Sequence, residues 1–225
     1  MLTKKTLTKP DLFLIAANIV PIIGAWFFHW DPRQIFMVYA LETVIIGFFT
    51  LVKMGIVTAF RKKDTWYNEG KSMQVSGLFF MFFFLVHYGL FVAIQTGIFV
   101  QISGMSKDFK IGFFDFFLHW PQYLGKDAYY MLAGFVISYG FNMLWNFVRP
   151  GYYRTVSLSL LMFQPYIRIF IQQLTVIIGS MFLSFGAGKI FIIVFALAKT
   201  FFEVFIDYDG ILKKSMADLE KKSGQ

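Results

Sequence analysis

Six polar residues that could bind a solute or move a proton stand inside long apolar runs of the sequence. They are Glu42, His87, Arg168, Gln172, Lys199 and Glu203. An ionised side chain at the centre of a membrane-spanning helix costs about 2.5 to 3.5 kcal/mol on insertion scales unless water or a partner meets it. We therefore expect these side chains to face one another inside a bundle, and we treat all six as candidate substrate-binding residues.

The spacing of the polar residues favours such an inward arrangement. Residues four apart lie on one face of a helix, and three sets follow this rule: Ser138, Asn142 and Asn146; Gln164, Arg168, Gln172 and, at i+11, Thr175; Lys199, Glu203 and Asp207. Lipid cannot satisfy so many polar groups, so the sets should turn toward a shared centre.

The charges within the apolar runs nearly cancel, which predicts two ion pairs. We expect Lys199 to pair with Glu203 along one helix and Glu42 to pair with Arg168 between helices. His87 is the residue of this set that could change its charge near neutral pH.

Composition sets the class of protein. Hydrophobic residues make up 57% of the 225 residues and charged residues only 15%, whereas charged residues are about a quarter of an ordinary soluble domain. The apolar runs are close to the ~20 residues that a helix needs to cross a membrane, and they lack the ~10-residue alternation of a barrel. The sequence thus predicts an all-α integral membrane protein with a single transmembrane domain over residues 1–225.

We expect a bundle of six transmembrane helices with a further helix lying in the membrane interface. The aromatic-rich connector 109–124 is too short to cross and is the predicted interfacial helix, and residues 64–74 form a polar link. The six predicted spans are 11–29, 35–59, 75–100, 127–148, 157–184 and 188–208.

The distribution of basic residues predicts the orientation. With six spans, 13 Lys and Arg residues fall on the side of the termini and 5 on the other side. Because basic residues are enriched in cytoplasmic loops, we expect a multi-pass protein of the cell (inner) membrane with both termini and the tail 209–225 in the cytoplasm.

Several chemistries are absent from the sequence. There is no Cys, and the three His residues are scattered, so we expect no metal site. We find no H-E-x-x-H, G-x-S-x-G, Walker or dinucleotide motif and expect no cofactor. The net charge of +8 comes from residues that flank the apolar runs, so we expect no nucleic acid. The expected partners are membrane lipid and either a small anionic solute or a membrane protein.

Some of these positions have a structural interpretation instead. Asn142, Asn146, Gln172 and Thr175 could simply hold helices together by hydrogen bonds. Three glycines inside the predicted spans are interpreted as positions of close helix packing: Gly47, Gly134 and Gly179.

Four short segments resemble a prokaryotic family of uncharacterised multi-pass membrane proteins, classed as a domain of unknown function. The segments are YALETVIIGFF at 39–49, HYGLF at 87–91, PYIRIF followed by IIG at 165–179, and AKTFFEVFIDYDG at 198–210. The resemblance covers most of the chain and implies no activity. Glu203 stands in the acidic place of the family's K-x-x-x-D/E pattern.

Three functions fit these observations. The first is a small transporter or channel-like protein, with Arg168 and Lys199 contacting an anionic group. The second is an intramembrane enzyme acting on a lipid-like substrate, with Glu42 or Glu203 as acid or base beside His87. The third is a non-catalytic scaffold or partner subunit in which every buried charge is paired.

Overall fold

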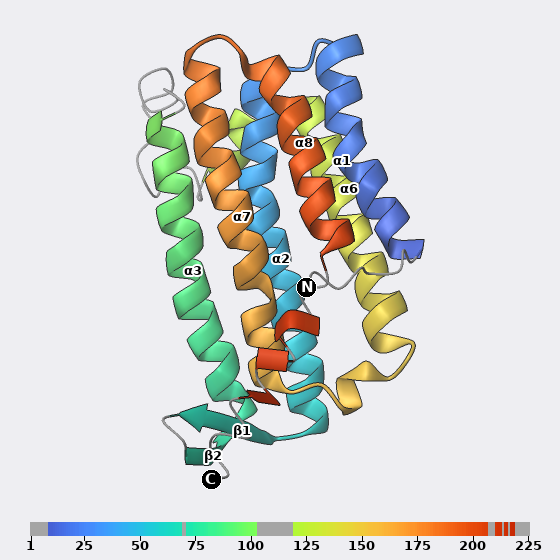
Figure 1. Cartoon of the computed structure of the whole chain (residues 1–225), viewed down its shortest axis with the longest axis vertical. Coiled ribbons are helices and arrows are strands. Elements are labelled where there is room, and N and C mark those ends of the chain that lie inside the picture. The colour runs from blue at the N-terminus through green and yellow to red at the C-terminus, as the bar shows by residue number, and fades with distance from the viewer. Residues whose placement is uncertain are drawn as a thin grey trace.

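Long α-helices lie side by side in the computed structural model, which describes residues 9–68, 71–102, 119–206, 210–212, 214–215 and 217–218 (Figure 1). The described helices of 18 residues or more are α1 (Lys9–Phe27), α2 (Pro32–Phe60), α3 (Gly77–Ile102), α6 (Lys126–Met143), α7 (Leu158–Ser184) and α8 (Gly188–Phe205). These helices confirm that the chain is mostly helical.

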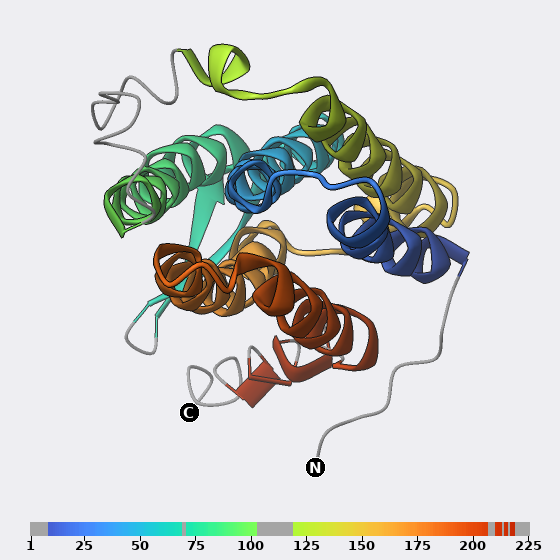
Figure 2. The same ribbon diagram turned by 90° about the horizontal axis from the view of Figure 1, so that it is seen from above.

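Helix α2 is the central element of the bundle. Viewed from above, α2 lies between α3 and α6, while α7 and α8 form the opposite side and α1 fills the space between α6 and α8 (Figure 2). Helix α2 packs against α3, α6, α7 and α8, and α1 packs against α6 and α8. Polar residues at the same level on the inner faces of these helices can therefore approach one another.

Three helices are long and apolar enough to cross a membrane, within the part of the chain that the structure describes. They are Pro32–Phe60, Gly77–Ile98 and Lys126–Val148. The outward face of α3 carries large apolar side chains that are more than half exposed, including Leu78, Phe82 and Leu90. Such a face suits lipid rather than water. The number of six spans remains a prediction.

A β-hairpin joins α2 to α3, where the sequence predicted only a polar link. Strand β1 (Lys63–Asn68) pairs antiparallel with β2 (Lys71–Ser76), with Lys63 opposite Ser76. Trp66 anchors the hairpin because its ring packs 5.5 Å from that of Phe80 on α3. The strands are short and mostly polar, with no long apolar run, which explains why the hydropathy pattern missed this element.

Helix α6 ends in a different helical form just before the sequence Arg149-Pro150-Gly151. A π-helical turn, η2 (Leu144–Val148), follows α6, and a 3-10 turn, η3 (Tyr152–Arg154), precedes α7. Gly151 has a φ of 70°, a conformation that glycine adopts without steric cost. The chain can therefore reverse direction here and enter α7.

Two predictions fall mostly outside the described residues. Of the interfacial segment 109–124, the structure describes 119–124, which contains the 3-10 helix η1 (Trp120–Tyr123). Of the tail 209–225, it describes only residues 210–212, 214–215 and 217–218. The interfacial helix and the cytoplasmic tail remain predictions.

The three glycines interpreted as packing positions behave differently. A Cβ added to Gly47 would lie 2.5 Å from the ring of Tyr88, so Gly47 is confirmed as a point of close approach between α2 and α3. The prediction for Gly134 was wrong, because nothing lies within 4 Å of a Cβ built there. Gly179 lies among the residues whose side-chain surroundings the structure does not describe.

Candidate functional site

A buried ion pair joins α2 to α8. The Lys199 Nζ atom lies 2.6 Å from Glu42 Oε1, and the two side chains are 4% and 0% exposed. Moving an isolated charge out of water is expensive, and the loss is offset only when the partner is close and further hydrogen bonds satisfy the remaining donors and acceptors. The short distance meets the first of these conditions.

Two further helices supply the hydrogen bonds. Lys199 Nζ also donates to Asn18 Oδ1 on α1 at 2.9 Å, and the Tyr139 hydroxyl on α6 donates to Glu42 Oε1 at 2.7 Å. Asn18 is fully buried and Tyr139 nearly so. The pair is thus the point at which α1, α2, α6 and α8 meet, and we call Asn18, Glu42, Tyr139 and Lys199 the polar centre.

Aromatic rings surround the ammonium group of Lys199. Its Nζ atom lies 4.7 Å from the ring centroid of Phe135 and 5.2 Å from that of Tyr39. Tyr39 packs in turn against Phe195, with centroids 4.3 Å apart. Ring faces attract a cation, and they also keep bulk water away from the ion pair. The polar centre is therefore a small charged site with apolar walls.

A regular spacing along the sequence builds these walls. Each of three helices places an aromatic residue one turn before its polar residue: Tyr39 before Glu42, Phe135 before Tyr139, and Phe195 before Lys199. Residues three or four apart share a helix face, so each helix presents an aromatic ring beside its polar group. Sequence reasoning missed Asn18 and Tyr139, and this aromatic-to-polar spacing is the signal that could have found Tyr139.

The ion pair that the structure describes is one that the sequence did not predict. Lys199 pairs with Glu42 from another helix, whereas the sequence paired Lys199 with Glu203 and Glu42 with Arg168, and these two pairs stay predictions. The prediction paired residues that are close in the sequence or at a similar estimated depth in the membrane. The rotation of each helix about its axis decides which helix faces meet. Arg168, Gln172 and Glu203 lie in α7 and α8, and their side chains are outside those that the structure describes.

His87 does not lie in the polar centre. Its side chain is exposed on α3, and its Nδ1 atom shares a hydrogen bond of 2.7 Å with the hydroxyl of Tyr166 on α7. The neighbouring residue, Tyr88, points inward instead and donates to the carbonyl oxygen of Thr43 at 2.7 Å. The expected inward position of His87 was therefore wrong, since the face of α3 that packs on α2 is the one that carries Tyr88.

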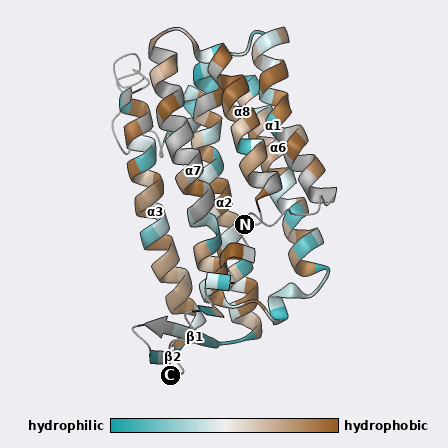
Figure 3. Ribbon diagram, viewed as in Figure 1, coloured by the Kyte–Doolittle hydropathy of each residue, from teal (hydrophilic) through white to brown (hydrophobic). Residues whose placement is uncertain are grey.

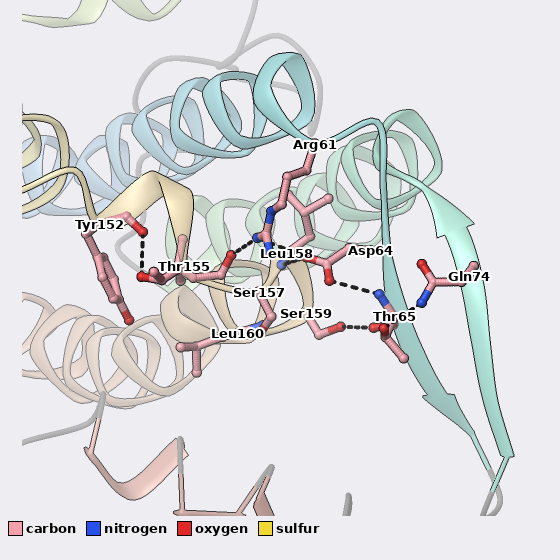
Figure 4. A network of polar contacts seen from close by, with 11 residues as sticks. Arg61, Asp64, Thr65, Gln74, Tyr152, Thr155, Ser157, Leu158, Ser159 and Leu160 are labelled. Atoms are coloured by element: carbon pink, nitrogen blue, oxygen red, sulfur yellow. Dashed lines mark hydrogen bonds and ion pairs between the residues drawn. The ribbon is translucent and has the colours of Figure 1, made fainter.

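The hairpin end of the bundle carries a second polar network (Figure 4). Asp64 accepts a hydrogen bond from the backbone N–H of Leu158 at 2.7 Å and lies 3.4 Å from Arg61. Arg61 also donates to the carbonyl oxygen of Val156, and Ser159 donates to that of Thr65 at 3.2 Å. Asp64 thus caps the start of α7 from the hairpin, a stabilising role for an acidic side chain at a helix N-terminus.

The described residues offer few ligands for a metal ion. Among them, no three of His, Asp and Glu lie close enough together to hold one. The chemistry available at the polar centre is instead that of one carboxylate, one ammonium group, one amide and one phenol. These groups can hold a proton or an anion.

Fold and site together define a mostly helical protein with three helices able to cross a membrane and a Lys–Glu pair buried between four helices. The chain belongs to a family whose model, described as "Family of unknown function (DUF6498)", matches residues 1–223. This match confirms the resemblance to a domain of unknown function over most of the chain. No curated protein and no solved structure matches the chain.

Proposed function

We propose that the chain is a small multi-pass membrane transporter in which the Glu42–Lys199 pair binds a proton and an anion. The observation that carries this proposal is the ion pair itself, which is fully enclosed and held by four helices. Charged groups at depth in a membrane protein mark solute and proton pathways more often than they mark simple packing.

The chemistry of the pair couples the two ligands. When Glu42 takes up a proton, Lys199 loses the negative charge that Glu42 supplies, and the loss of a nearby counter-charge is costly for a buried ammonium group. A small anion can then replace the carboxylate beside Lys199, and the neutral carboxyl group keeps a donor and an acceptor for Tyr139. Release of the anion and the proton restores the original pair. One proton and one negative charge therefore move together, with no net charge transferred.

The aromatic walls limit what the site can accept. Phe135 and Tyr39 lie within 5.2 Å of the Lys199 Nζ atom, so an anion must be small or must approach as helices separate. We further propose the six-span arrangement with both termini in the cytoplasm. In this arrangement the basic hairpin end faces the cytoplasm, as the enrichment of basic residues in cytoplasmic loops requires.

Proton flux into liposomes tests the proposal. The purified protein is reconstituted with an internal pH dye, and a gradient of chloride, nitrate or phosphate is applied in turn. At least one anion is expected to drive proton movement in the wild type. Glu42→Gln is expected to reduce this movement to the rate of protein-free liposomes, because glutamine keeps an acceptor for Lys199 but takes up no proton.

A matched control uses another lysine of the same helix. Lys189, exposed at the start of α8, is replaced in Lys189→Gln and is expected to leave the flux unchanged. Equal flux in Glu42→Gln and the wild type would refute the proposal, as would the absence of flux with every anion.

A second candidate function is a non-catalytic scaffold, favoured by the completeness of the contacts at the polar centre. Glu42 and Lys199 are both buried and both hydrogen-bonded, which is also what a purely structural pair requires. The scaffold predicts no flux in the wild type and a well-folded Glu42→Leu, Lys199→Met double variant. The described contacts do not bring together His87 and Glu42, the pair that the enzyme hypothesis names: His87 shares a hydrogen bond with Tyr166, whereas Glu42 accepts one from Tyr139.

A further inference from the structure

The hairpin end of the bundle is strongly basic. Its described exposed basic residues come from β1, β2 and the turn between η2 and α7, where Figure 3 shows hydrophilic residues gathering at the lower end of the molecule. They are Lys62, Lys63, Lys71, Arg149 and Arg154. Asp64 on β1 already pairs with Arg61 and caps α7.

The opposite end of the bundle has no such excess. At the ends of its described helices, Arg33, Lys126 and Lys189 are accompanied by Asp31 and Asp127. Helices begin and end at both ends of the bundle, so the presence of helix termini does not explain why the hairpin end carries more positive charge than the other end. The hairpin end therefore has an electrostatic preference for negative charge that the other end lacks.

Two arginines at the hairpin end are held against aromatic rings. The guanidinium carbon of Arg149 lies 4.3 Å from the ring centroid of Trp145. That of Arg154 lies 5.7 Å from the ring of Phe60 and 5.6 Å from that of Tyr153. A guanidinium group over a ring is attracted by the ring face and can still donate N–H hydrogen bonds to another ligand. No carboxylate among the described residues pairs with either arginine.

The backbone between the two arginines is also fixed by hydrogen bonds. The N–H of Arg149 donates to the carbonyl oxygen of Leu144 at 2.9 Å, and the N–H of Arg154 donates to that of Gly151 at 3.0 Å. Arg154 Nε donates to the Tyr153 hydroxyl at 3.3 Å, and the other N–H groups of the guanidinium are left to donate to a ligand. The two side chains are thus presented from a defined turn, so less conformational entropy is lost when they bind a ligand.

We propose that Arg149 and Arg154 bind the phosphate groups of anionic phospholipids at the hairpin end. Guanidinium groups match the geometry of phosphate oxygens and bind them by two donors at once. Tryptophan and tyrosine beside them are the side chains enriched where a membrane meets water, which places the arginines at headgroup level. Trp145, Tyr153 and Phe60 supply this aromatic belt, and Lys62 and Lys63 add positive charge nearby.

Native mass spectrometry of the protein in mild detergent tests the proposal. Short-chain phosphatidylglycerol and phosphatidylcholine are titrated separately, and the bound copies are counted. Each basic residue near an anionic surface contributes enough to change affinity about fivefold, so the Arg149→Gln, Arg154→Gln double variant is expected to bind phosphatidylglycerol about thirtyfold more weakly. Binding of phosphatidylcholine is expected to be weak in both proteins.

The control removes the same charge from the other end. Lys126→Gln, Lys189→Gln is expected to bind phosphatidylglycerol as the wild type does, and a melting curve for each variant separates lost binding from lost folding. Equal loss in both double variants would overturn the proposal by showing a general charge effect. Displacement of phosphatidylglycerol by equimolar inorganic phosphate would overturn it by showing a site for soluble phosphate. Equal binding of phosphatidylglycerol and phosphatidylcholine would also overturn it, because it would show that binding does not depend on the net charge of the headgroup.

Discussion

Replacing Glu42 by leucine removes the carboxylate that neutralises Lys199 and leaves the ammonium group enclosed. In the structure Lys199 Nζ is 2.6 Å from Glu42 Oε1, and Lys199 is only 4% exposed. Water cannot take over the role of the carboxylate without opening the contacts to Phe135 and Tyr39. The Tyr139 hydroxyl loses its acceptor as well.

The expected loss in the free energy of unfolding follows from the buried charge that loses its ion-pair partner. Removing one partner of a buried pair costs about 3 to 5 kcal/mol, whereas replacing both with apolar residues of similar volume is often neutral. We therefore expect Glu42→Leu to lower the free energy of unfolding by about 3 to 5 kcal/mol, and the double variant Glu42→Leu, Lys199→Met to recover most of this loss. The two substitutions must be strongly non-additive because they share one interaction.

Unfolding by titration of denaturing detergent into mild-detergent micelles, followed by circular dichroism, measures both quantities. Lys189→Met on the same helix is the control, and as an exposed surface change it is expected to alter stability by less than about 0.5 kcal/mol. A cost below about 1 kcal/mol for Glu42→Leu would place it in the range of an exposed pair and refute the reasoning. A double variant as unstable as the sum of the two single variants would do the same.

Four further changes give independent checks by the same unfolding titration. Tyr139→Phe removes a hydrogen bond to a charged acceptor and is expected to cost about 1.5 to 3 kcal/mol; an unchanged stability would show that the bond is dispensable. Gly47→Ala places a methyl group 2.5 Å from the Tyr88 ring and is expected to cost about 1 to 3 kcal/mol, whereas Gly134→Ala, with nothing within 4 Å, is expected to stabilise slightly through helix propensity. Asp64→Ala removes the cap of α7 and is expected to cost about 0.5 to 2 kcal/mol, seen also as faster proteolysis near residue 158, and a resistant variant would contradict the capping role.

The hairpin illustrates what hydropathy alone cannot detect. Residues 63–68 and 71–76 are polar enough to be interpreted as a link, and their pairing depends on cross-strand register and on the contact of Trp66 with Phe80. Because the two strands are short, their signal in the sequence is weak. Only packing against α3 and the cap on α7 fix them in place.

At the polar centre, too, the sequence predicted part of the arrangement and helix packing decided the rest. The sequence correctly predicted that buried charges would meet inside the bundle, and it included both Glu42 and Lys199 among the candidates. It could not choose between Glu203, Arg168 and Glu42 as partners, because spacing specifies which residues share a face of one helix and not which faces of two helices meet. The inward position expected for His87 failed for this reason, since a rotation of one residue along α3 places Tyr88 inside and His87 outside.

The sequence by itself determined the helical class, the presence of segments long and apolar enough to cross a membrane, and the membership of a family of unknown function. These properties depend on local composition and on periods along one chain, which are readable without knowing what lies beside each helix. Tertiary structure decided that Lys199 reaches Glu42, that Asn18 and Tyr139 complete the centre, and that Arg149 and Arg154 stack on aromatic rings. These contacts join residues far apart in the chain, so they depend on the rotation and crossing of helices, which side-chain packing between the helices sets.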